Sequence, residues 1–320
     1  MKKYDLDITV AICTWNRADL LEQTLTQMHA LSVPSEVRWE LLVINNNCTD
    51  HTDEVIARHE GALPIRRLFE PKPGHSNARN CGVANARGAY TIWTDDDVLV
   101  DSQWIRAYID AFRRWPDAVV FGGPIEPWYE SEPPDWIREG WEHVASAYAI
   151  RDLGDEPFRF TTKMPYGANI VFRSDIFSKH GFDPALGRTG DKLISGDETS
   201  VARKLIQDGA DGWWVPEARV RHFVPSKRLT FKYLNDWFYA MGQTRAINWC
   251  RSVDDVYSGR GKWLRMRAAY VRMKYEFEKR FRPPDRWVRR LAGSSQLRGW
   301  RDTVLEYRRT GKLGENGNDT

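Results

Sequence analysis

The sequence contains little cysteine and no long hydrophobic run. The four cysteines are Cys13, Cys48, Cys81 and Cys250. They are far apart and form no CxxC pair, which argues against a zinc site or a disulfide framework. No segment approaches the roughly 18 to 20 consecutive apolar residues of a transmembrane helix. Asp5 and Asp7 precede any apolar run, unlike the start of a secretory signal. We therefore expect reduced thiols in a cytoplasmic protein.

Two common nucleotide-binding signatures are also missing. No GxGxxG follows the first predicted strand, and no GxxxxGK followed by Ser or Thr occurs anywhere in the chain. A dinucleotide fingerprint and a P-loop are therefore excluded, and any nucleotide must be held in another way. The 320 residues, 42% hydrophobic and 28% charged, have the composition of a globular protein large enough to bury a core.

Short apolar runs alternate with helical patterns over the first 123 residues. Strands are predicted at 8–13, 39–44, 65–69, 90–94 and 118–123. Apolar residues at helical spacing follow most of these runs, for example Leu21, Leu25 and Met28 after the first. After the strand at 90–94, one helix face is predicted to carry Trp104, Ile105, Tyr108, Ile109 and Phe112. This alternation predicts an α/β fold with a mostly parallel, doubly wound sheet that binds ligands at the carboxyl ends of its strands.

The pattern changes beyond residue 123. Residues 123–165 are rich in Pro, Trp and acids, and are predicted to form a long excursion over the active face. A strand at 166–174, a helix at 196–209 and a strand pair within 213–225 are predicted to follow. Helices are expected from about 231, and residues 313–320 are expected to be disordered.

Polar residues follow three of the predicted strands. They are Thr14 to Arg17, Asn45 to Asn47, and Asp95 to Asp97. Because the carboxyl ends of parallel strands share one edge, we expect these residues to meet in one crevice. The consecutive aspartates repel one another and need a compensating positive charge. Their oxygen atoms suit a hard divalent cation, with a solvated turn or a helix cap as the alternative.

A series of motifs extends over residues 8–225. They are CTWNR, VINNNCTDHT, PGHSNARNCGVANARGAYTIWTDDDV, YGANIVFRSDIF, GFDPALGRTGDKLISGDETSVARKL and VRHF. In order and spacing this series resembles glycosyltransferase family 2, whose members are inverting enzymes of the GT-A fold. The resemblance implies a GT-A catalytic domain at 1–228, with a nucleotide-sugar half at 1–123 and an acceptor half at 124–228. A helical extension would follow at 229–312.

The resemblance also implies a metal-dependent donor site. In the family, a D-x-D element binds Mn²⁺ or Mg²⁺ and, through the metal, the diphosphate of a nucleotide-sugar that is usually a UDP-sugar. By position this element is Asp95 to Asp97, with Asp97 the expected direct ligand. Asp95 is a further candidate ligand, and Asp95 and Asp96 are expected nearer the ribose and sugar. His222, in VRHF, stands where many relatives carry a histidine at the metal or diphosphate; a structural histidine is the alternative.

The same resemblance implies a set of residues that bind the nucleotide base. Its members are Thr14, Asn16, Arg17, Asn45 and Arg79. Asn45 stands where the family often has an aspartate that accepts a hydrogen bond from uracil, and an amide oxygen can accept the same bond. This difference makes uridine a weaker inference than nucleotide binding itself. The alternatives are a simple turn at Asn45 to Asn47 and a helix-surface salt bridge for Arg79.

An inverting transfer needs a base that takes the proton of the acceptor hydroxyl. The family supplies it from an acidic pair ahead of a helix, and the corresponding pair here is Asp197 and Glu198. Ungapped alignment places Glu198 at the base position, with Asp197 as the alternative. Both residues can also favour the helix N-terminus electrostatically.

Four further residues are candidates for the donor-sugar and acceptor side. They are Gly167, Asn169, Trp128 and Trp136. Amides and aromatic faces suit sugar rings, whereas core packing is the alternative for the tryptophans.

Charge is distributed unevenly along the chain. Residues 221–320 carry 23 Lys and Arg against 10 Asp and Glu, whereas residues 1–220 carry 24 against 34. The basic part contains the aromatic residues Trp237, Phe238, Trp249, Trp263, Tyr270, Tyr275, Phe281, Trp287 and Trp300. This composition fits a segment held on anionic lipid headgroups at the inner face of the plasma membrane. It equally fits helices that pack on the sheet or form an oligomer, and nucleic acid binding is the least favoured interpretation.

Together these features predict an inverting glycosyltransferase that uses a metal ion and a nucleotide-sugar. The expected acceptor is a hydroxyl of a glycan or lipid-linked molecule, in cell-surface polysaccharide or glycolipid synthesis. One alternative is a nucleotidyltransferase, which would release pyrophosphate where the first hypothesis predicts UDP. The other is a non-catalytic binding protein that uses the basic C-terminal residues.

Overall fold

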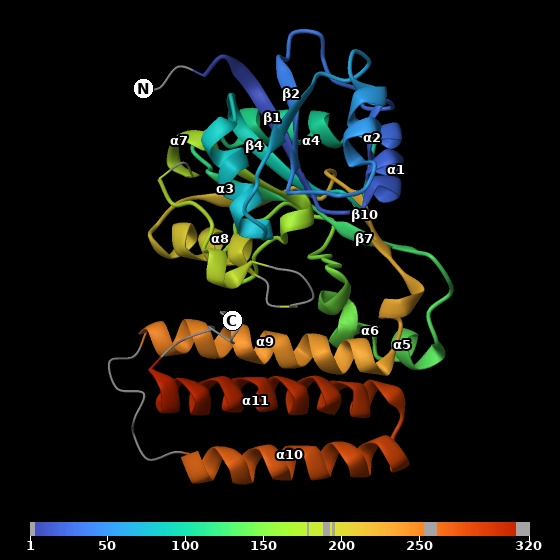
Figure 1. The fold of residues 1–320 in the computed structure, drawn as a ribbon, viewed down its shortest axis with the longest axis vertical. Coiled ribbons are helices and arrows are strands. Elements are labelled where there is room, and N and C mark those ends of the chain that lie inside the picture. Colours follow the sequence, from blue (N-terminus) through green and yellow to red (C-terminus); the bar gives the residue numbers. More distant parts are fainter. Residues whose placement is uncertain (1–3, 178, 188–192, 194–195, 253–260, 312–320) are drawn as a thin grey trace. The chain divides into compact units, whose positions relative to one another are not determined.

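The computed structural model describes residues 4–177, 179–187, 193, 196–252 and 261–311 (Figure 1). The chain forms two compact units. The sheet unit consists of Met1–Trp128, Ala149–Gly190 and Gly196–Phe223, and the helical unit of Tyr129–Tyr148, Asp191–Ser195 and Val224–Thr320. The last segment of the helical unit begins at Val224, near the predicted domain boundary at 228, but the unit also takes in Tyr129–Tyr148 from the predicted acceptor half. The expected disordered tail, 313–320, lies outside the described residues.

The sheet unit is built on a seven-stranded sheet with the order β3-β2-β1-β4-β8-β6-β9. The strands are β1 (Leu6–Thr14), β2 (Trp39–Asn45), β3 (Ile65–Phe69), β4 (Gly88–Asp95), β6 (Val120–Gly122), β8 (Ile170–Arg173) and β9 (Gly212–Trp214). Strands β1 to β4 run parallel to one another, and β6 runs parallel to β9, whereas β8 runs antiparallel to β4 and β6. The prediction of a mostly parallel α/β sheet is confirmed.

Burial on both faces explains why the central strands read as continuous apolar runs. In β1 every residue from Ile8 to Thr14 is buried, and so is every residue of β2 from Glu40 to Asn45. The parallel register pairs Thr14 with Asn45 and Cys13 with Asp95. The polar residues that end β1, β2 and β4 are therefore neighbours at one edge of the sheet.

Helices connect and cover these strands. They are α1 (Ala18–Met28), α2 (Thr52–His59), α3 (His75–Asn85), α4 (Trp104–Arg114), α7 (Ser174–Phe177) and α8 (Asp197–Gln207), with 3-10 turns η2 (Gly167–Asn169) and η3 (Pro184–Leu186). The predicted apolar face of α4 is confirmed, because Trp104, Ile105 and Tyr108 are buried. The α3 helix lies so close to β4 that a Cβ on Gly82 would come within 2.7 Å of the Trp93 ring.

A second sheet has the order β5-β10-β7. Its strands are β5 (Val98–Val100), β7 (Ile125–Tyr129) and β10 (Val220–Val224). The prediction of a strand pair within 213–225 is wrong in its pairing, because β9 joins β6 in the large sheet while β10 pairs antiparallel with β5. This pairing places His222 opposite Val98, directly after the three aspartates.

The segment 123–165 is more regular than the predicted excursion. It contains β7, α5 (Asp135–Glu139), α6 (Trp141–Val144) and the 3-10 turn η1 (Ala145–Tyr148). Its apolar side chains explain the difference, because Ile137, Val144 and Tyr148 are fully buried. Part of the segment therefore belongs to a hydrophobic core and does not form an irregular loop.

Three long helices dominate the helical unit (Figure 1). They are α9 (Phe231–Ser252), α10 (Gly261–Phe281) and α11 (Pro284–Thr310), preceded by η4 (Ser226–Arg228). The α11 helix lies between the other two and also contacts α5 and α6. No described helix is long and apolar enough to cross a membrane.

Most of the C-terminal aromatic residues pack inside this unit. Trp237, Phe238, Tyr275 and Trp287 are all buried. Trp249 and Trp300 pack at a small cluster formed by Ala246, Cys250 and Val304. The side chain of Trp263 lies outside the described residues. The hypothesis of an interfacial segment is therefore wrong for the buried aromatic residues, because their rings form the helical core.

Candidate functional site

Three carboxylates and a histidine meet where β4 gives way to β5. Asp95 ends β4, and Asp96 and Asp97 form the turn that follows. The backbone of this turn is held from two sides, since Thr24 Oγ1 donates to the carbonyl of Asp96 at 2.9 Å and Phe223 N donates to that of Asp97 at 2.9 Å. The aspartates therefore have a fixed backbone and do not form a solvated turn.

The donor atoms in this turn fit a divalent cation. One ligand atom from each of Asp95, Asp97 and His222 lies within 4.8 Å of the other two. His222 Nε2 is 3.4 Å from Asp97 Oδ1, and both side chains are buried. Two carboxylates with one imidazole suit Mn²⁺ or Mg²⁺, whose remaining positions would take phosphate oxygens or water. Burial, opposed by Arg79 and reinforced by Asp97, raises the pKa of Asp95 to about 6. A cation at this position would relieve that repulsion.

Arg17 compensates part of the negative charge. Its Nη1 lies 3.0 Å from Asp96 Oδ1 and 2.7 Å from Asp97 Oδ2. Burial raises the pKa of Asp96, and Arg17 opposes that shift. The resemblance implied that Arg17 contacts the nucleotide base. In the structure, its guanidinium pairs with two of the predicted donor-site carboxylates.

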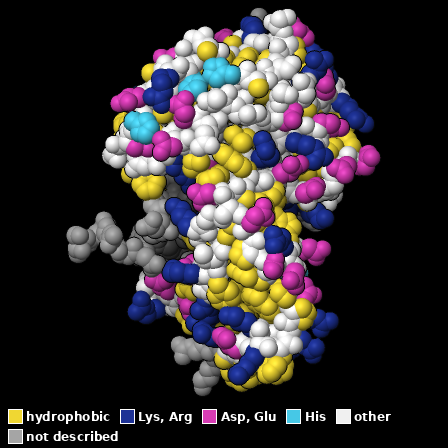
Figure 2. Space-filling model, turned by 90° about the vertical axis from the view of Figure 1, so that its right-hand side faces the viewer, with side chains coloured by type: hydrophobic (Ala, Val, Ile, Leu, Met, Phe, Trp, Pro, Cys, Tyr) yellow, Lys and Arg dark blue, Asp and Glu magenta, His cyan; other side chains and the backbone are white. Residues whose placement is uncertain are grey.

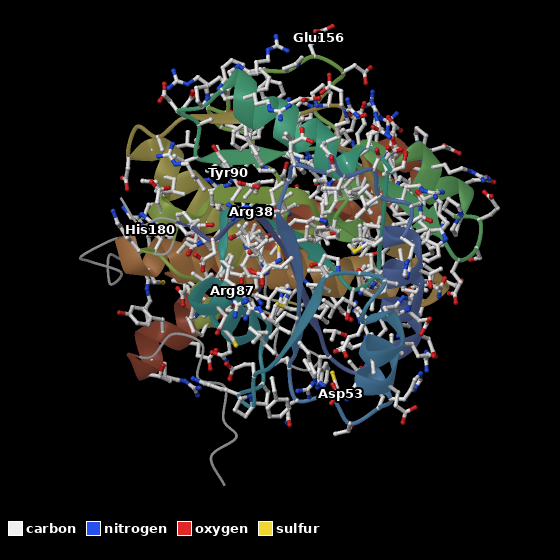
Figure 3. All side chains as sticks on the ribbon, turned by 90° about the horizontal axis from the view of Figure 1, so that it is seen from above. Arg38, Asp53, Arg87, Tyr90, Glu156 and His180 are labelled. Atoms are coloured by element: carbon white, nitrogen blue, oxygen red, sulfur yellow. The ribbon has the colours of Figure 1, made fainter. Side chains whose placement is uncertain are left out.

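The predicted base-binding amides hold the loops at the ends of β1 and β2. Asn45 Oδ1 accepts from Cys48 N at 2.8 Å, and its Nδ2 donates to Asp53 Oδ1 at 2.7 Å. Asn16 Oδ1 accepts from Thr49 N at 2.7 Å. Asp53, labelled in Figure 3, also accepts hydrogen bonds from the guanidinium of Arg67. These contacts were not predicted, because they depend on the approach of α2 and β3 to β2.

The two candidates for the catalytic base lie at the start of α8. Asp197 accepts from Ser76 Oγ at 2.7 Å and from Arg79 Nη1 at 3.0 Å, and the same Nη1 lies 3.0 Å from Glu198 Oε2. Arg79 Nη2 is 3.8 Å from Asp95 Oδ1. The structure therefore brings the predicted base pair and the predicted metal site together through one arginine. Arg79 is only 3% exposed, so the alternative of a helix-surface salt bridge is wrong.

The two carboxylates of the pair differ in accessibility and in charge. The side chain of Asp197 is 2% exposed and that of Glu198 is 13% exposed. Burial raises the pKa of Asp197 to about 7 although Arg79 opposes the shift. Burial also acts on Glu198, but Arg79 together with hydrogen bonds from Asp197 and from the backbone outweighs it and lowers the pKa of Glu198 to about 2. Glu198 is therefore the more accessible member, and its ionised form is favoured more strongly than that of Asp197.

Gly167 is the glycine that this arrangement requires. A Cβ at this position would lie 2.3 Å from Arg79 Nη2, and the amide of Gly167 donates to Glu198 Oε1 at 3.3 Å. A larger residue would displace Arg79 from the carboxylates. Ser76 was missed entirely, although it follows Gly74 in a motif that already pointed to this region.

The other sugar-side candidates have structural contacts. Asn169 is fully buried, and its oxygen accepts from Trp104 Nε1 and Tyr108 Oη while its nitrogen donates to two backbone carbonyls. Its hydrogen-bonding capacity is thus used within the protein, and its candidacy as a sugar contact is wrong. Trp136 packs against Trp287 in the helical unit, at 5.6 Å between ring centroids. The ring of Trp128 is 4.8 Å from that of Phe223.

Residues 9–181 match the family described as Glycosyl transferase family 2. The chain belongs to this family and is a glycosyltransferase. This result decides against the nucleotidyltransferase and against the non-catalytic binding protein.

Two relatives match most of the chain. The succinoglycan biosynthesis protein ExoM of Rhizobium meliloti is 28% identical, over 76% of this chain and 75% of its own length. The glucosyl-dolichyl phosphate glucuronosyltransferase of Haloferax volcanii is 30% identical, over 72% of this chain and 73% of its own length.

Solved structures show the same GT-A fold. The mannosyltransferase PcManGT of Pyrobaculum calidifontis, in complex with GDP-Man and Mn²⁺, matches with a TM-score of 0.53 and 18% identity. That match covers 98% of this chain and 80% of PcManGT. TarS 1-349 of S. aureus, in complex with UDP, gives a TM-score of 0.52 at 14% identity, covering 96% of this chain and 92% of TarS 1-349.

Proposed function

We propose that this glycosyltransferase moves a sugar from a nucleotide-sugar, a UDP-sugar in the first instance, to a hydroxyl of a glycan or lipid-linked acceptor with inversion of configuration. The observation that carries the proposal is the bridge made by Arg79. This residue joins Glu198 and Asp197 to Asp95, so that a candidate base and a candidate metal site belong to one electrostatic cluster. A transferase needs both functions within reach of one anomeric carbon.

Asp95, Asp97 and His222 are the residues that would hold Mn²⁺ or Mg²⁺. The bound ion would supply electrostatic stabilisation of the negative charge that develops on the departing diphosphate. Arg17 pairs with Asp96 and Asp97 and orients both carboxylates. Thr14, Asn16 and Asn45 act on the nucleotide side by fixing the shape of the loops at the ends of β1 and β2.

Glu198 is proposed as the base. Its carboxylate takes the proton of the acceptor hydroxyl while the acceptor oxygen bonds to the anomeric carbon and the bond from that carbon to the nucleoside diphosphate breaks. Asp197 is the less suitable group, because it is almost completely buried and holds Ser76 and Arg79. We assign Asp197 and Arg79 to the positioning of Glu198.

The names of the relatives support the proposed acceptor class. One acts in succinoglycan biosynthesis, and the other is a glucuronosyltransferase of glucosyl-dolichyl phosphate. An acceptor in polysaccharide or glycolipid synthesis follows from these two names. The donor base is proposed as uridine from the family pattern, and GDP-sugars are the main competing donors because PcManGT was solved with GDP-Man.

Calorimetric titration of the purified protein tests the donor site. UDP-, GDP- and dTDP-sugars are titrated with Mn²⁺ and then with EDTA, beside an Asp97→Ala variant. Asp110→Ala is the matched control, because Asp110 is exposed on α4. We expect one nucleotide series to bind only with metal, with binding lost in Asp97→Ala and kept in Asp110→Ala. Absence of nucleotide binding under both conditions, or equal binding by Asp97→Ala, would overturn the proposal.

A further inference from the structure

One helix carries most of the large apolar side chains that the structure exposes. Among the residues with described side chains, the exposed large apolar ones are Trp15, Phe69, Met266, Tyr270, Met273, Phe277 and Phe281. Five of these lie on α10, and their exposed fractions are 73%, 53%, 62%, 58% and 61% in chain order. Isolated apolar residues on a surface are ordinary, but five on one helix are a patch that needs an explanation.

These five side chains form one stripe along α10. Met266, Tyr270, Met273, Phe277 and Phe281, which we call the α10 stripe, follow one another at intervals of three or four residues. This spacing places them on a single face of the helix. The opposite face carries Ala268 and Tyr275, both buried. The stripe therefore points away from the side of α10 that packs against the other helices.

The packed face of α10 already has its partners. The ring of Tyr275 stacks on Phe231 of α9 at 6.1 Å between centroids. Glu278 pairs with Arg290 of α11, with Arg290 Nε 3.0 Å from Glu278 Oε1. The fold of the helical unit thus accounts for one face of α10, and it does not account for the α10 stripe.

Basic side chains border the stripe. Residues 266–282 contain the bases Arg267, Arg272, Lys274, Lys279, Arg280 and Arg282 and the acids Glu276 and Glu278. Lys274 Nζ lies 5.5 Å from the Tyr270 ring centroid, and the guanidinium of Arg280 lies 5.9 Å from that of Phe281. Both acids are paired with arginines: Glu276 lies 4.0 Å from Arg272, and Glu278 lies 3.0 Å from Arg290. Figure 2 shows hydrophobic side chains gathered on one face of the helical unit, with both basic and acidic side chains around them.

We propose that the α10 stripe docks on an anionic lipid bilayer. An amphipathic helix of this kind lies in the plane of the interface, with its apolar residues among the upper acyl chains and its Lys and Arg at the lipid phosphates. Each basic residue near such a surface adds to the attraction. The stripe provides the apolar part, and Lys274 and Arg280 at its borders provide the charge.

A second copy of the chain fits the stripe less well. A two-fold contact through α10 would bring the same basic borders of both copies against each other. Like charges at such a distance repel, and the acids of α10 are already paired. An anionic bilayer removes this repulsion and covers the same apolar area. The α10 stripe shares no residue with the proposed donor site, so failure of either proposal leaves the other standing.

Vesicle sedimentation of the full chain tests this surface. The vesicles are phosphatidylcholine alone or with about 30% phosphatidylglycerol, at about 0.1 M and about 0.5 M NaCl. We expect binding to the anionic vesicles that weakens with salt. The paired change Met273→Gln with Phe277→Gln should weaken it by about tenfold or more, because two apolar side chains lose their burial.

The controls separate the stripe from general damage. The matched pair Met273→Leu with Phe277→Leu keeps an apolar face and should bind as the unchanged protein does. Lys274→Gln with Arg280→Gln should weaken binding to anionic vesicles and reduce its dependence on salt. Far-UV circular dichroism and thermal unfolding show whether each variant is folded. Equal vesicle binding by the Gln pair, or a dimer that this pair dissociates in a protein without affinity for vesicles, would overturn the proposal.

Discussion

Arg79 is shared by three carboxylates in the interior of the sheet unit. Asp197 and Glu198 lie 3.0 Å from its Nη1, and Asp95 lies 3.8 Å from its Nη2. Its guanidinium is also 5.3 Å from the ring centroid of Phe182. Removing this buried cation would leave three carboxylates without a compensating charge, and an uncompensated buried charge destabilises the fold strongly.

Replacing Arg79 by methionine should destabilise the protein strongly. We expect Arg79→Met to lower the free energy of unfolding by about 3–5 kcal/mol, as for other broken buried ion pairs. Arg67→Met is the matched control, because Arg67 pairs with Asp53 at the surface and such pairs contribute about 0–1 kcal/mol. Urea denaturation of metal-free protein measures both. Equal losses in the two variants would show that the three carboxylates do not depend on Arg79.

Substitutions of Glu198 and of Asp197 should have different effects on the turnover rate. Glu198→Gln keeps the shape of the side chain and removes the base, so we expect the turnover rate to fall by about 10²–10⁴-fold with little change in donor affinity. Asp197→Asn should act mainly on stability, because it disturbs the bonds to Ser76 and Arg79. Release of nucleoside diphosphate and calorimetric donor binding measure the two effects. If Asp197→Asn abolishes turnover and Glu198→Gln does not, Asp197 is the base.

At individual positions, the sequence predicted which polar residues share one edge of the sheet better than it predicted their contacts. The polar ends of β1, β2 and β4 were expected to share one edge, and the parallel register confirms this. The partners of Arg17 and Asn45 were not predictable, because Asp97 and Asp53 reach them only through the packing of other elements. A motif indicates which residues are used, whereas tertiary packing decides which atoms are still available.

Two glycines let α9 and α11 cross closely. A Cβ on Gly242 would lie 2.0 Å from the carbonyl oxygen of Gln296, and one on Gly299 would lie 1.9 Å from that of Tyr239. Each glycine thus faces the backbone of the opposite helix. A backbone cannot move aside as a flexible side chain can, so the helices themselves would have to separate.

We predict opposite effects for two glycine substitutions on α11. Gly299→Ala should lower the free energy of unfolding by about 1–3 kcal/mol through overpacking. Gly293→Ala meets nothing within 4 Å and should raise it by up to about 1 kcal/mol, because alanine favours the helix. Thermal unfolding followed by circular dichroism measures both. Stabilisation by both substitutions would mean that the two helices are not in close contact.

Among the elements, local pattern was reliable where one face or both faces are buried. The early strands and the face of α4 were predicted correctly, because their apolar periodicity reports burial directly. The pairing of β9 and β10 failed, since neighbouring strands in sequence can join different sheets. Composition likewise could not separate the buried Trp287 from the exposed Phe281 in the same basic segment.

The helical unit joins distant parts of the chain, and α11 is its centre. Helices α5 and α6 contact it from the middle of the sequence, and α9 and α10 contact it from the C-terminal part. Trp287, Val288 and Leu291 of α11 are buried among these helices. The family motifs predicted the class of enzyme, but they could not predict this assembly, which depends on contacts outside the motifs.

Deletion of residues 284–320, which include α11, should remove more helical structure than the deleted segment itself contains. We expect the remaining helices of this unit to unfold, so that the loss of helical signal in circular dichroism exceeds the share of α11 and binding of a hydrophobic dye increases. The full chain, measured in parallel, is the reference. A loss equal to α11 alone would show that α9 and α10 are stable without it.

The contacts of α5 and α6 with α11 join residues that are synthesised at well-separated times. At about 5–20 residues per second, the ribosome completes α11 roughly 10 to 30 seconds after α6. During that interval Ile137 and Val144, fully buried in the finished protein, lack α11 as a packing partner. A chaperone that covers apolar segments of nascent chains is therefore expected to bind this protein between those two points of translation.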